Sequence, residues 1–427
     1  MPIGVGLIGA GTVGGGVIQT LAANREVIRQ RTGADVVLRH AVDLAPERFD
    51  AFPMDGVTVG TDAMALINDP GVQIVVELIG GLKPAKTFIL EALKAKKNVV
   101  TANKMLLAHD GPELVHAAKE NGVELRFEAA VAGGIPIIKA LREGLVSNHI
   151  KRIYGILNGT CNYILSRMSY EGLDFDTVLK QAQEKGFAET PPDLDILGHD
   201  TAHKCQILAS LAFGTEIDLN DVYVEGITGI THADVAYATE MGYVIKLLAI
   251  IQGGNGSIEA RVHPTLVPED KLLASVRNEF NAIYVESDIA DKTLYYGRGA
   301  GRMPTASAVV ADIVDIARRD DSPAPVPFNY GPKLPVKDIG DITSQYYLRL
   351  TTHDTPGVLG RVCTILGDHG VSIASCIQKD PHGSEYLPVV LMTHETKESA
   401  LQAAVQQIDG LDSIPELTHM IRVLDDE

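Results

Sequence analysis

A glycine-rich turn near the N-terminus constrains the fold of this chain more than any other feature. The apolar run 3–8 is typical of a buried strand, and it leads through the spacing G-x-G-x-x-G into a helix-like stretch, 17–29. The first glycine of such a turn permits a tight bend, the second lets the backbone approach a pyrophosphate, and the third lets helix and strand pack closely. The turn residues that we expect at a ligand are Gly9, Gly11, Thr12, Val13 and Gly14. Because helix N-termini attract phosphate, the pattern predicts a bound dinucleotide, with a purely structural turn as the alternative.

Length, charge and cysteine usage limit the class of protein. The 427 residues are enough for about three domains. A net charge of −18, from 55 acidic and 37 basic residues, argues against nucleic acid or an anionic membrane as a partner. We find no apolar stretch of membrane-spanning length and no signal-peptide pattern. The four cysteines include no C-x-x-C pair, which is typical of reduced thiols, so we expect a cytoplasmic protein.

Strand-like and helix-like segments alternate along residues 1–133. The helical patterns include 83–96 and 111–121. Strand-like runs lie at 3–8, 36–42, 74–78, 98–101 and 123–127. This order predicts a Rossmann-like, doubly wound parallel sheet that binds its ligand at the carboxyl ends of the strands.

The rest of the chain predicts two further domains joined by a linker. Residues 134–320 mix both patterns, which indicates an α+β domain on an antiparallel or mixed sheet. Its strand-like runs are 150–157, 282–287 and 293–297, and its helical stretches are 176–185, 201–213 and 234–252. Residues 321–345 are rich in Pro, Gly and Asp, as linkers are. Residues 346–427 follow the order βαββαβ of a ferredoxin-like module.

The end of the second strand candidate bears on the choice of dinucleotide. Asp43 stands there and could accept a hydrogen bond from the ribose 2′-hydroxyl of NAD. An exposed turn aspartate is the alternative. Arg48 lies nearby and could instead meet the 2′-phosphate of NADP.

Several polar segments interrupt the apolar runs and are candidates for the chemistry. Lys104 follows a strand end, where it could bind substrate, move a proton or simply be exposed. Glu128 opens the run E-A-A-V-A-G-G-I-P, whose oxygens could surround a hard cation or merely form a tight crossover. In L-N-G-T-C-N-Y, the pair Asn158-Gly159 predicts a turn, and Thr160 and Asn162 could start a helix or bind a substrate. Asn158 is a further candidate for substrate binding. Gly301 precedes a helical pattern, 307–318, in a glycine-rich loop that could approach a cofactor.

The segment 189–204 is the richest in charge. Asp200 and Lys204 are spaced to share one helix face, and the apolar residues that follow indicate that this face is partly buried. A lysine shielded from water beside an aspartate can exchange a proton with an alcohol. Carboxylates that could receive an ammonium group are Glu189, Asp193 and Asp195. His199 and His203 could alternatively bind a transition metal, although the spacing lacks the glutamate of a zinc protease helix.

Taken together, these segments resemble the homoserine dehydrogenases, in the monofunctional bacterial form with a C-terminal ACT domain. The likeness covers nearly the whole chain. It rests on the glycine turn, T-A-N-K at 101–104, E-A-A-V-A-G-G-I-P at 128–136, L-N-G-T-C-N-Y at 157–163, D-x-x-G-x-D-x-x-x-K at 195–204 and G-x-G-A-G at 297–301. It implies a cofactor domain at 1–133, a catalytic and dimerisation domain at 134–320 and an ACT regulatory domain at 346–427.

The resemblance implies NAD(P)-dependent interconversion of L-homoserine and L-aspartate 4-semialdehyde, on the route to threonine, methionine and isoleucine. It implies that Lys204 transfers the proton and that Lys104 lies between cofactor and substrate. The carboxylates that would hold the amino acid or the lysine are Glu189, Asp195 and Asp200. Gly301 would contact the cofactor. A monovalent cation, sodium in most relatives, would lie at Glu128, Val131, Gly133 and Ile135.

One departure from the family concerns the cofactor. Many relatives carry an arginine, suited to a 2′-phosphate, where this chain has Val42 before Asp43. We therefore expect NAD, or both cofactors, over strict use of NADP. The ACT domain implies an amino-acid effector, threonine in many relatives, and assembly into a homodimer or homotetramer.

Three other functions fit parts of the sequence. A dehydrogenase for another amino or hydroxy acid would keep the same fold. A regulatory amino-acid-binding protein could use the dinucleotide domain as a redox sensor, although the cluster at 189–204 argues against it. A metal-dependent hydrolase would use His199 and His203.

Overall fold

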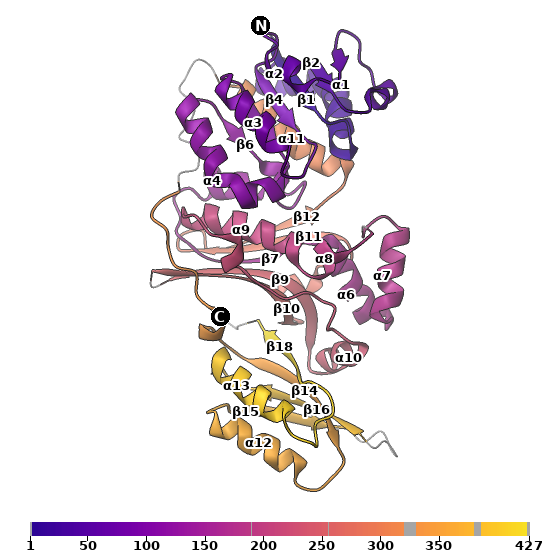
Figure 1. Cartoon of the computed structure of the whole chain (residues 1–427), viewed down its shortest axis with the longest axis vertical. Coiled ribbons are helices and arrows are strands. Elements are labelled where there is room, and N and C mark those ends of the chain that lie inside the picture. The colour runs from indigo at the N-terminus through magenta and orange to yellow at the C-terminus, as the bar shows by residue number, and fades with distance from the viewer. Residues whose placement is uncertain (1, 189, 255, 320–329, 380–385, 425–427) are drawn as a thin grey trace.

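The computed structural model describes residues 2–188, 190–254, 256–319, 330–379 and 386–424. Figure 1 shows three regions in succession along the long axis, with the N-terminal sheet at one end and the C-terminal module at the other. Within these residues, none of the helices has both the length and the apolar character that a membrane crossing requires.

The N-terminal region is a six-stranded parallel sheet in the order β3-β2-β1-β4-β5-β6. This order is that of a doubly wound dinucleotide-binding fold, and it confirms the prediction for this region. The strands are β1 (Ile3–Ile8), β2 (Val36–Val42), β3 (Thr58–Gly60), β4 (Ile74–Glu77), β5 (Asn98–Thr101) and β6 (Leu125–Arg126). The helices are α1 (Thr12–Thr32), α2 (Ala63–Ile67), α3 (Ala85–Lys94) and α4 (Lys104–Asn121).

Helix α1 starts five residues before the predicted stretch 17–29. The prediction missed its first turns because they contain three consecutive glycines, which are poor helix formers. A Cβ at Gly16 would come within 2.7 Å of the carbonyl oxygen of Arg302. Arg302 begins α11 (Arg302–Ala317), which lies beside α1 although it is distant in sequence (Figure 1). The glycines of α1 therefore permit a close contact between the two helices, and through it the chain returns from the central region to the N-terminal one.

The central region is built on a large mixed sheet in the order β12-β11-β7-β9-β10-β18-β14-β16-β15, with β8 also paired to β10. Its first strands are β7 (Ile150–Ile156), β8 (Tyr223–Val224), β9 (Tyr243–Gly254), β10 (Ser257–Pro268), β11 (Phe280–Ser287) and β12 (Lys292–Arg298). Helices of this region are α5 (Ile137–Lys139), α6 (Gly159–Glu171), α7 (Phe175–Glu184), α8 (Asp193–Ile196), α9 (His199–Phe213) and α10 (His232–Glu240).

The prediction of a helix over 234–252 is confirmed up to Glu240 and wrong beyond it. Helix α10 ends at Glu240, Gly242 takes a left-handed φ of 80°, and β9 begins at Tyr243. Strand β9 pairs with β7 on one side and β10 on the other, and most of its residues are buried. A run that is buried on both faces is apolar throughout and shows neither helical nor strand periodicity, so its pattern does not distinguish the two.

The C-terminal region has the expected order βαββαβ. It comprises β14 (Tyr346–His353), α12 (Val358–Asp368), β15 (Ile373–Gln378), β16 (Tyr386–Thr393), α13 (Glu398–Asp409) and β18 (His419–Val423). A short ladder joins β13 (Thr343–Ser344) to β17 (Thr396–Lys397). Because β18 pairs with β10 as well as with β14, the module continues the central sheet.

The described part of the predicted linker, 330–345, lies against the central region. Val336 forms an isolated parallel bridge with Ile258, and the N–H of Gly331 bonds to the carbonyl of Gly214.

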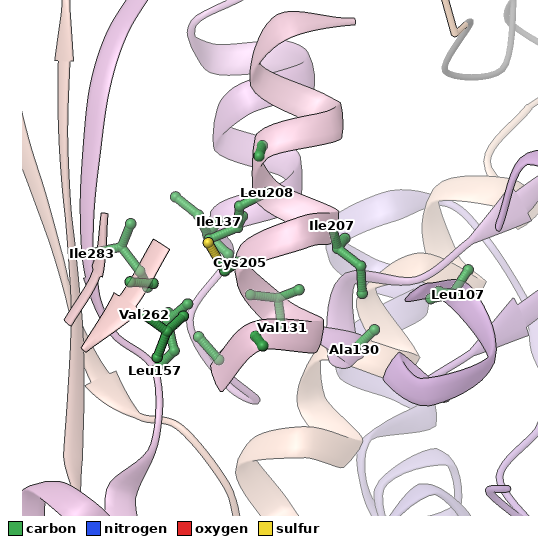
Figure 2. Close-up of a cluster of buried hydrophobic side chains, with 14 of the residues drawn as sticks. Leu107, Ala130, Val131, Ile137, Leu157, Cys205, Ile207, Leu208, Val262 and Ile283 are labelled. Carbon is green, nitrogen blue, oxygen red and sulfur yellow. The ribbon is translucent and has the colours of Figure 1, made fainter. Parts of the chain in front are cut away.

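One apolar core joins the N-terminal and central regions. Figure 2 shows side chains of α9 between those of α4 and those of the central sheet. The labelled members are Leu107, Ala130, Val131, Ile137, Leu157, Cys205, Ile207, Leu208, Val262 and Ile283. Continuous packing of this kind resists small displacements, so α9 is held in a fixed position between the two regions.

Candidate active site

The glycine turn after β1 has the geometry of a phosphate cradle. Gly9 has a φ of 104°, and a Cβ at Gly14 would lie 1.9 Å from the carbonyl oxygen of Gly9, so both positions require glycine. A Cβ at Gly11 would meet nothing within 4 Å. Gly11 and the exposed Thr12 therefore border open space at the N-terminus of α1, and Val13 lies half-buried beside them. The residues present fit a dinucleotide pyrophosphate.

Asp43 is bonded to the glycine turn. Its carboxylate accepts the N–H of Ala10 at 2.6 Å and that of Ala45 at 2.9 Å. Arg48 lies 3.4 Å from the same carboxylate, with its side chain 56% exposed. An acidic and a basic group therefore stand together where the ribose of a bound dinucleotide would lie.

A cleft of about 540 Å³ opens between the N-terminal and central regions. Its walls come from the start of α4, the start of α6, helices α8 and α9, and the loop before α11. The structure brings together here the predicted residues Lys104, Asn158, Thr160, Asp195, Asp200, Lys204 and Gly301. Glu189 lies outside the described residues.

Asp200 binds two lysines from different elements. Lys204, one turn further along α9, donates to its Oδ2 at 2.6 Å and to the carbonyl of Leu157 at 2.7 Å. Lys104, the first residue of α4, forms an ion pair with its Oδ1. The Asp200–Lys204 spacing predicted their shared face, but nothing in the sequence indicated that Lys104 would reach the same carboxylate.

Burial and charge set the pKa values of this cluster. Burial lowers the pKa of Lys204, and the charge of Asp200 opposes this effect. Burial would raise the pKa of Asp200, but the two lysines outweigh it and hold that pKa well below its usual range. Burial raises the pKa of Asp195. The site thus combines a permanently ionised aspartate with a lysine that loses its proton more readily than usual.

Asn158 links the helix that it caps to both aspartates. Its Oδ1 accepts the N–H of Cys161 at the start of α6, and its Nδ2 donates to Asp195 at 2.7 Å and Asp200 at 2.9 Å. Thr160 donates its hydroxyl to the carbonyl of Phe187 at 2.6 Å. The cap of α6 is therefore Asn158, whereas Thr160 and Asn162 lie inside the helix; Asn158 also lines the cleft.

The segment proposed for a cation contains oxygens of two kinds. The carboxylate of Glu128 accepts the N–H groups of Ile138 and Lys139 at 2.9 and 2.7 Å, so it is already engaged at the start of α5. The buried backbone from Val131 to Gly133 turns through positive φ values of 56° at Ala132 and 51° at Gly133. The carbonyls of Val131 and Gly133 accept no hydrogen bond from any residue that the structure describes. Free buried carbonyls are suited to a hard monovalent cation.

His199 and His203 are not arranged as a metal site. His199 is exposed, whereas His203 is buried with its ring centroid 5.7 Å from that of His109, and burial lowers its pKa to about 4. Over the residues with a described position, no group of three His, Cys, Asp or Glu side chains could hold a metal ion.

Three residues of the cleft wall, Lys185, Glu279 and Asn281, were not expected from the sequence. Lys185 donates to the hydroxyl of Tyr163 at 3.0 Å, and Glu279 accepts from Arg298 at 3.0 Å. Asn281 is a polar residue inside an apolar strand pattern, which is the one sequence signal that could have identified it.

The fold and the cleft define a dinucleotide-dependent dehydrogenase that carries a C-terminal ferredoxin-like module. Comparison with known families agrees. Residues 9–128 match the homoserine dehydrogenase NAD binding domain, 136–314 match homoserine dehydrogenase, and 346–412 match the ACT domain. The chain belongs to the homoserine dehydrogenase family, and it is an NAD(P)-dependent oxidoreductase.

Individual relatives cover almost the whole chain. A homoserine dehydrogenase of Neisseria gonorrhoeae is 44% identical over 99% of this chain and 98% of its own length. One from Synechocystis is 42% identical over 99% of this chain and its own full length. The crystal structure of a homoserine dehydrogenase from Thiobacillus denitrificans has a TM-score of 0.94 at 45% identity, covering 100% of this chain and 99% of that one.

Proposed function

We propose that the chain interconverts L-homoserine and L-aspartate 4-semialdehyde, with Lys204 as the proton-transfer residue. The observation that carries this proposal is the buried Lys204–Asp200 pair, which lies in the cleft between the N-terminal and central regions. Burial favours the neutral amine, and a neutral amine can accept the hydroxyl proton of homoserine. In the reverse direction the ammonium of Lys204 returns that proton to the carbonyl oxygen.

The other groups in the cleft orient the reactants. Asp200 and the carbonyl of Leu157 hold Lys204 in one position, and Asp200 also anchors Lys104 between the cofactor and substrate sides. The amino-acid part of the substrate binds at Asn158, Thr160, Asp195 and, with the family, Glu189. A nicotinamide cofactor, when bound, exchanges a hydride with C4 of the substrate. Holding the reacting atoms in line supplies much of the acceleration.

The cofactor binds at Gly9, Gly11, Thr12, Val13, Gly14 and Gly301, with its ribose at Asp43. Asp43 favours a 2′-hydroxyl, whereas the exposed Arg48 can meet a 2′-phosphate, which supports NAD or dual use. A hyperthermophilic archaeal homoserine dehydrogenase, with 26% identity and a TM-score of 0.64 over 74% of this chain, was solved in complex with NADPH. A monovalent cation, sodium by resemblance, binds at Glu128, Val131, Gly133 and Ile135.

The remaining proposals concern regulation and assembly. The ACT module binds an amino-acid effector, threonine by resemblance, which feeds back on the first reaction committed to threonine, methionine and isoleucine. The chain assembles as a homodimer or homotetramer in the cytoplasm. Exposed apolar side chains on and beside the edge strand β12, at Ile289, Leu294 and Tyr296, support such an assembly.

The first test is the initial rate of homoserine-dependent reduction of NAD⁺ and of NADP⁺ at mildly alkaline pH, with sodium or potassium present. We expect turnover. The ratio of the two rates shows whether the preference of Asp43 for a 2′-hydroxyl or that of Arg48 for a 2′-phosphate decides the choice of cofactor. Other amino and hydroxy acids serve as controls for the substrate. Folded protein that turns over neither cofactor with homoserine would contradict the proposal.

A further inference from the structure

Asn281 is a buried polar residue in the cleft wall. It lies in β11 opposite Gly297 of β12, it is 1% exposed, and it lines the cleft. Its carboxamide lies directly against the loop before α11, because a Cβ at Gly299 would come within 2.0 Å of its Nδ2. Glycine at position 299 therefore leaves the space that this side chain occupies.

The Oδ1 atom of the Asn281 carboxamide is fully buried and has no hydrogen-bond partner among the residues that the structure describes. Two other buried asparagines nearby are well bonded. Asn162 donates to the carbonyls of Asn278 and Phe280, at 2.9 and 3.1 Å, and Asn158 donates to both aspartates. Native proteins leave few buried polar groups unpaired, and an exception requires an explanation such as a ligand that is bound during function.

The place of Asn281 indicates which ligand this is. The loop from Gly299 to Gly301 leads into α11, whose first turn packs on the glycines of α1. A dinucleotide with its pyrophosphate at the N-terminus of α1 and its reacting ring near Lys204 must pass this loop. Asn281 lies directly under the loop, within the same cleft as Lys204.

We propose that Asn281 binds the carboxamide of the nicotinamide ring and so fixes which face of the ring meets the substrate. A primary carboxamide offers one acceptor oxygen and an N–H donor. The nicotinamide carboxamide offers the same pair, so the two groups can bond reciprocally. The ammonium group of the substrate can only donate and its carboxylate can only accept, and neither would pair both ends of Asn281.

The test uses Asn281→Leu, which keeps the branched shape and removes both polar atoms. The dissociation constant of the oxidised cofactor is measured without homoserine, and again with a cofactor analogue in which a methyl ketone replaces the carboxamide. The melting temperature of the cofactor-free protein is measured beside it. The matched control is Asn148→Leu, because Asn148 accepts from Ser287 and Ala290 in a loop on the same sheet and has a structural role.

We expect Asn281→Leu to weaken binding of the natural cofactor about tenfold and binding of the ketone analogue by a smaller factor, because the analogue keeps the acceptor oxygen but has no N–H to donate to Oδ1. The melting temperature of the cofactor-free variant stays the same or rises, since no protein hydrogen bond is lost. The control lowers the melting temperature and leaves both dissociation constants unchanged. Equal weakening of both cofactors, a lowered melting temperature with unchanged binding, or a change confined to the KM of homoserine would each overturn the proposal. Because cofactor binding is measured without substrate, a failure of the homoserine reaction itself would be seen separately.

Discussion

Lys204 is the residue on which the proposed chemistry depends most directly. Replacing it with alanine removes the only side chain that we assign to proton transfer. We expect Lys204→Ala to lower kcat by about 10²-fold or more, which is the usual size of a general acid–base contribution. Steady-state kinetics measures this loss, and the dissociation constant of the cofactor should stay unchanged as a control. A rate near that of the wild type would rule Lys204 out.

Asp200 controls the proton affinity of that lysine. Its negative charge stabilises the ammonium form, so Asp200→Asn should lower the pKa of Lys204 further than burial already does. Oxidation of homoserine needs the neutral amine, and its rate therefore rises with pH through the pKa of Lys204. We expect the acidic limb of the pH profile of kcat/KM to move to lower pH in Asp200→Asn, with a lower plateau because Lys104 and Lys204 lose their shared anchor. An unmoved limb would assign it to another group.

At the residue scale, the sequence predicted contacts between side chains that are close along the chain. It missed contacts between side chains that are distant in sequence and meet only in the fold. The spacing of Asp200 and Lys204 gave their contact, because a helix repeats every 3.6 residues. The ion pair from Lys104 joins two domains, and no local pattern encodes it. Asn281 was missed because a single polar residue in a strand has many possible structural roles.

At the scale of elements, strand β9 shows where periodicity fails. The strand around Lys246 is buried between two neighbouring strands. Its sequence is therefore apolar without the alternation of a half-exposed strand, and for this reason the pattern predicts a helix. Lys246 itself is fully buried, and its Nζ donates to the carbonyl of Val276 and to Oδ1 of Asn162 at 3.1 Å. These bonds join β9 to α6 and to the loop after residue 275.

Lys246 should make the stability of the fold depend on pH. Burial lowers its pKa from 10.5 to about 7. Between these two values the unfolded chain binds more protons at this residue than the folded one, so the free energy of unfolding rises with pH across this window. Below pH 7 the cost of a buried ammonium is present in full.

The comparison with Lys246→Met isolates this contribution. Relative to the variant, the wild type should gain on the order of a few kcal/mol in the free energy of unfolding between pH 7 and pH 10. Denaturant unfolding at several pH values measures the difference. Parallel curves for the two proteins over that range would show that Lys246 does not titrate as described.

At the scale of the whole molecule, the ACT module is held to the central region by buried charges. Asp234 of α10 is fully buried and accepts from Arg349 at 2.6 Å and from the hydroxyl of Tyr347 at 3.1 Å, both on β14. Arg422 of β18 donates to Glu398 at 2.7 Å and to Glu225 of the central region at 2.8 Å. A movement within the module therefore reaches the central sheet without crossing a flexible joint.

Removing one partner of such a pair leaves a charge without its counter-ion. We expect Arg349→Leu to lower the free energy of unfolding by about 3–5 kcal/mol, because Asp234 then stays buried without the guanidinium that pairs with it, even though the Tyr347 hydroxyl still donates to it. The double variant with Asp234→Asn should lose less than the sum of the two single changes. Thermal or denaturant unfolding of all four proteins gives the coupling energy, and strictly additive losses would show that the pair does not act as a unit.

The fold class and the order of the modules were predictable at this scale, because each region repeats its own pattern of elements. It was not predictable that two regions share one sheet. The pairing of β10 with β18 joins residues about 150 positions apart, such as Thr265 and Arg422. Contacts of such separation depend on the completed fold and leave no periodic trace.

The position of β18 between β10 and β14 has a consequence for how the molecule is made. Residues 419–423 leave the ribosome after both of the strands that flank them, yet they fill a place in the interior of the sheet. Until they emerge, two neighbouring strands synthesised long before present unpaired edges, the kind of surface on which growing chains stick to one another. A nascent chain of this protein is thus exposed to misassembly for as long as the strand that belongs between β10 and β14 has not been made.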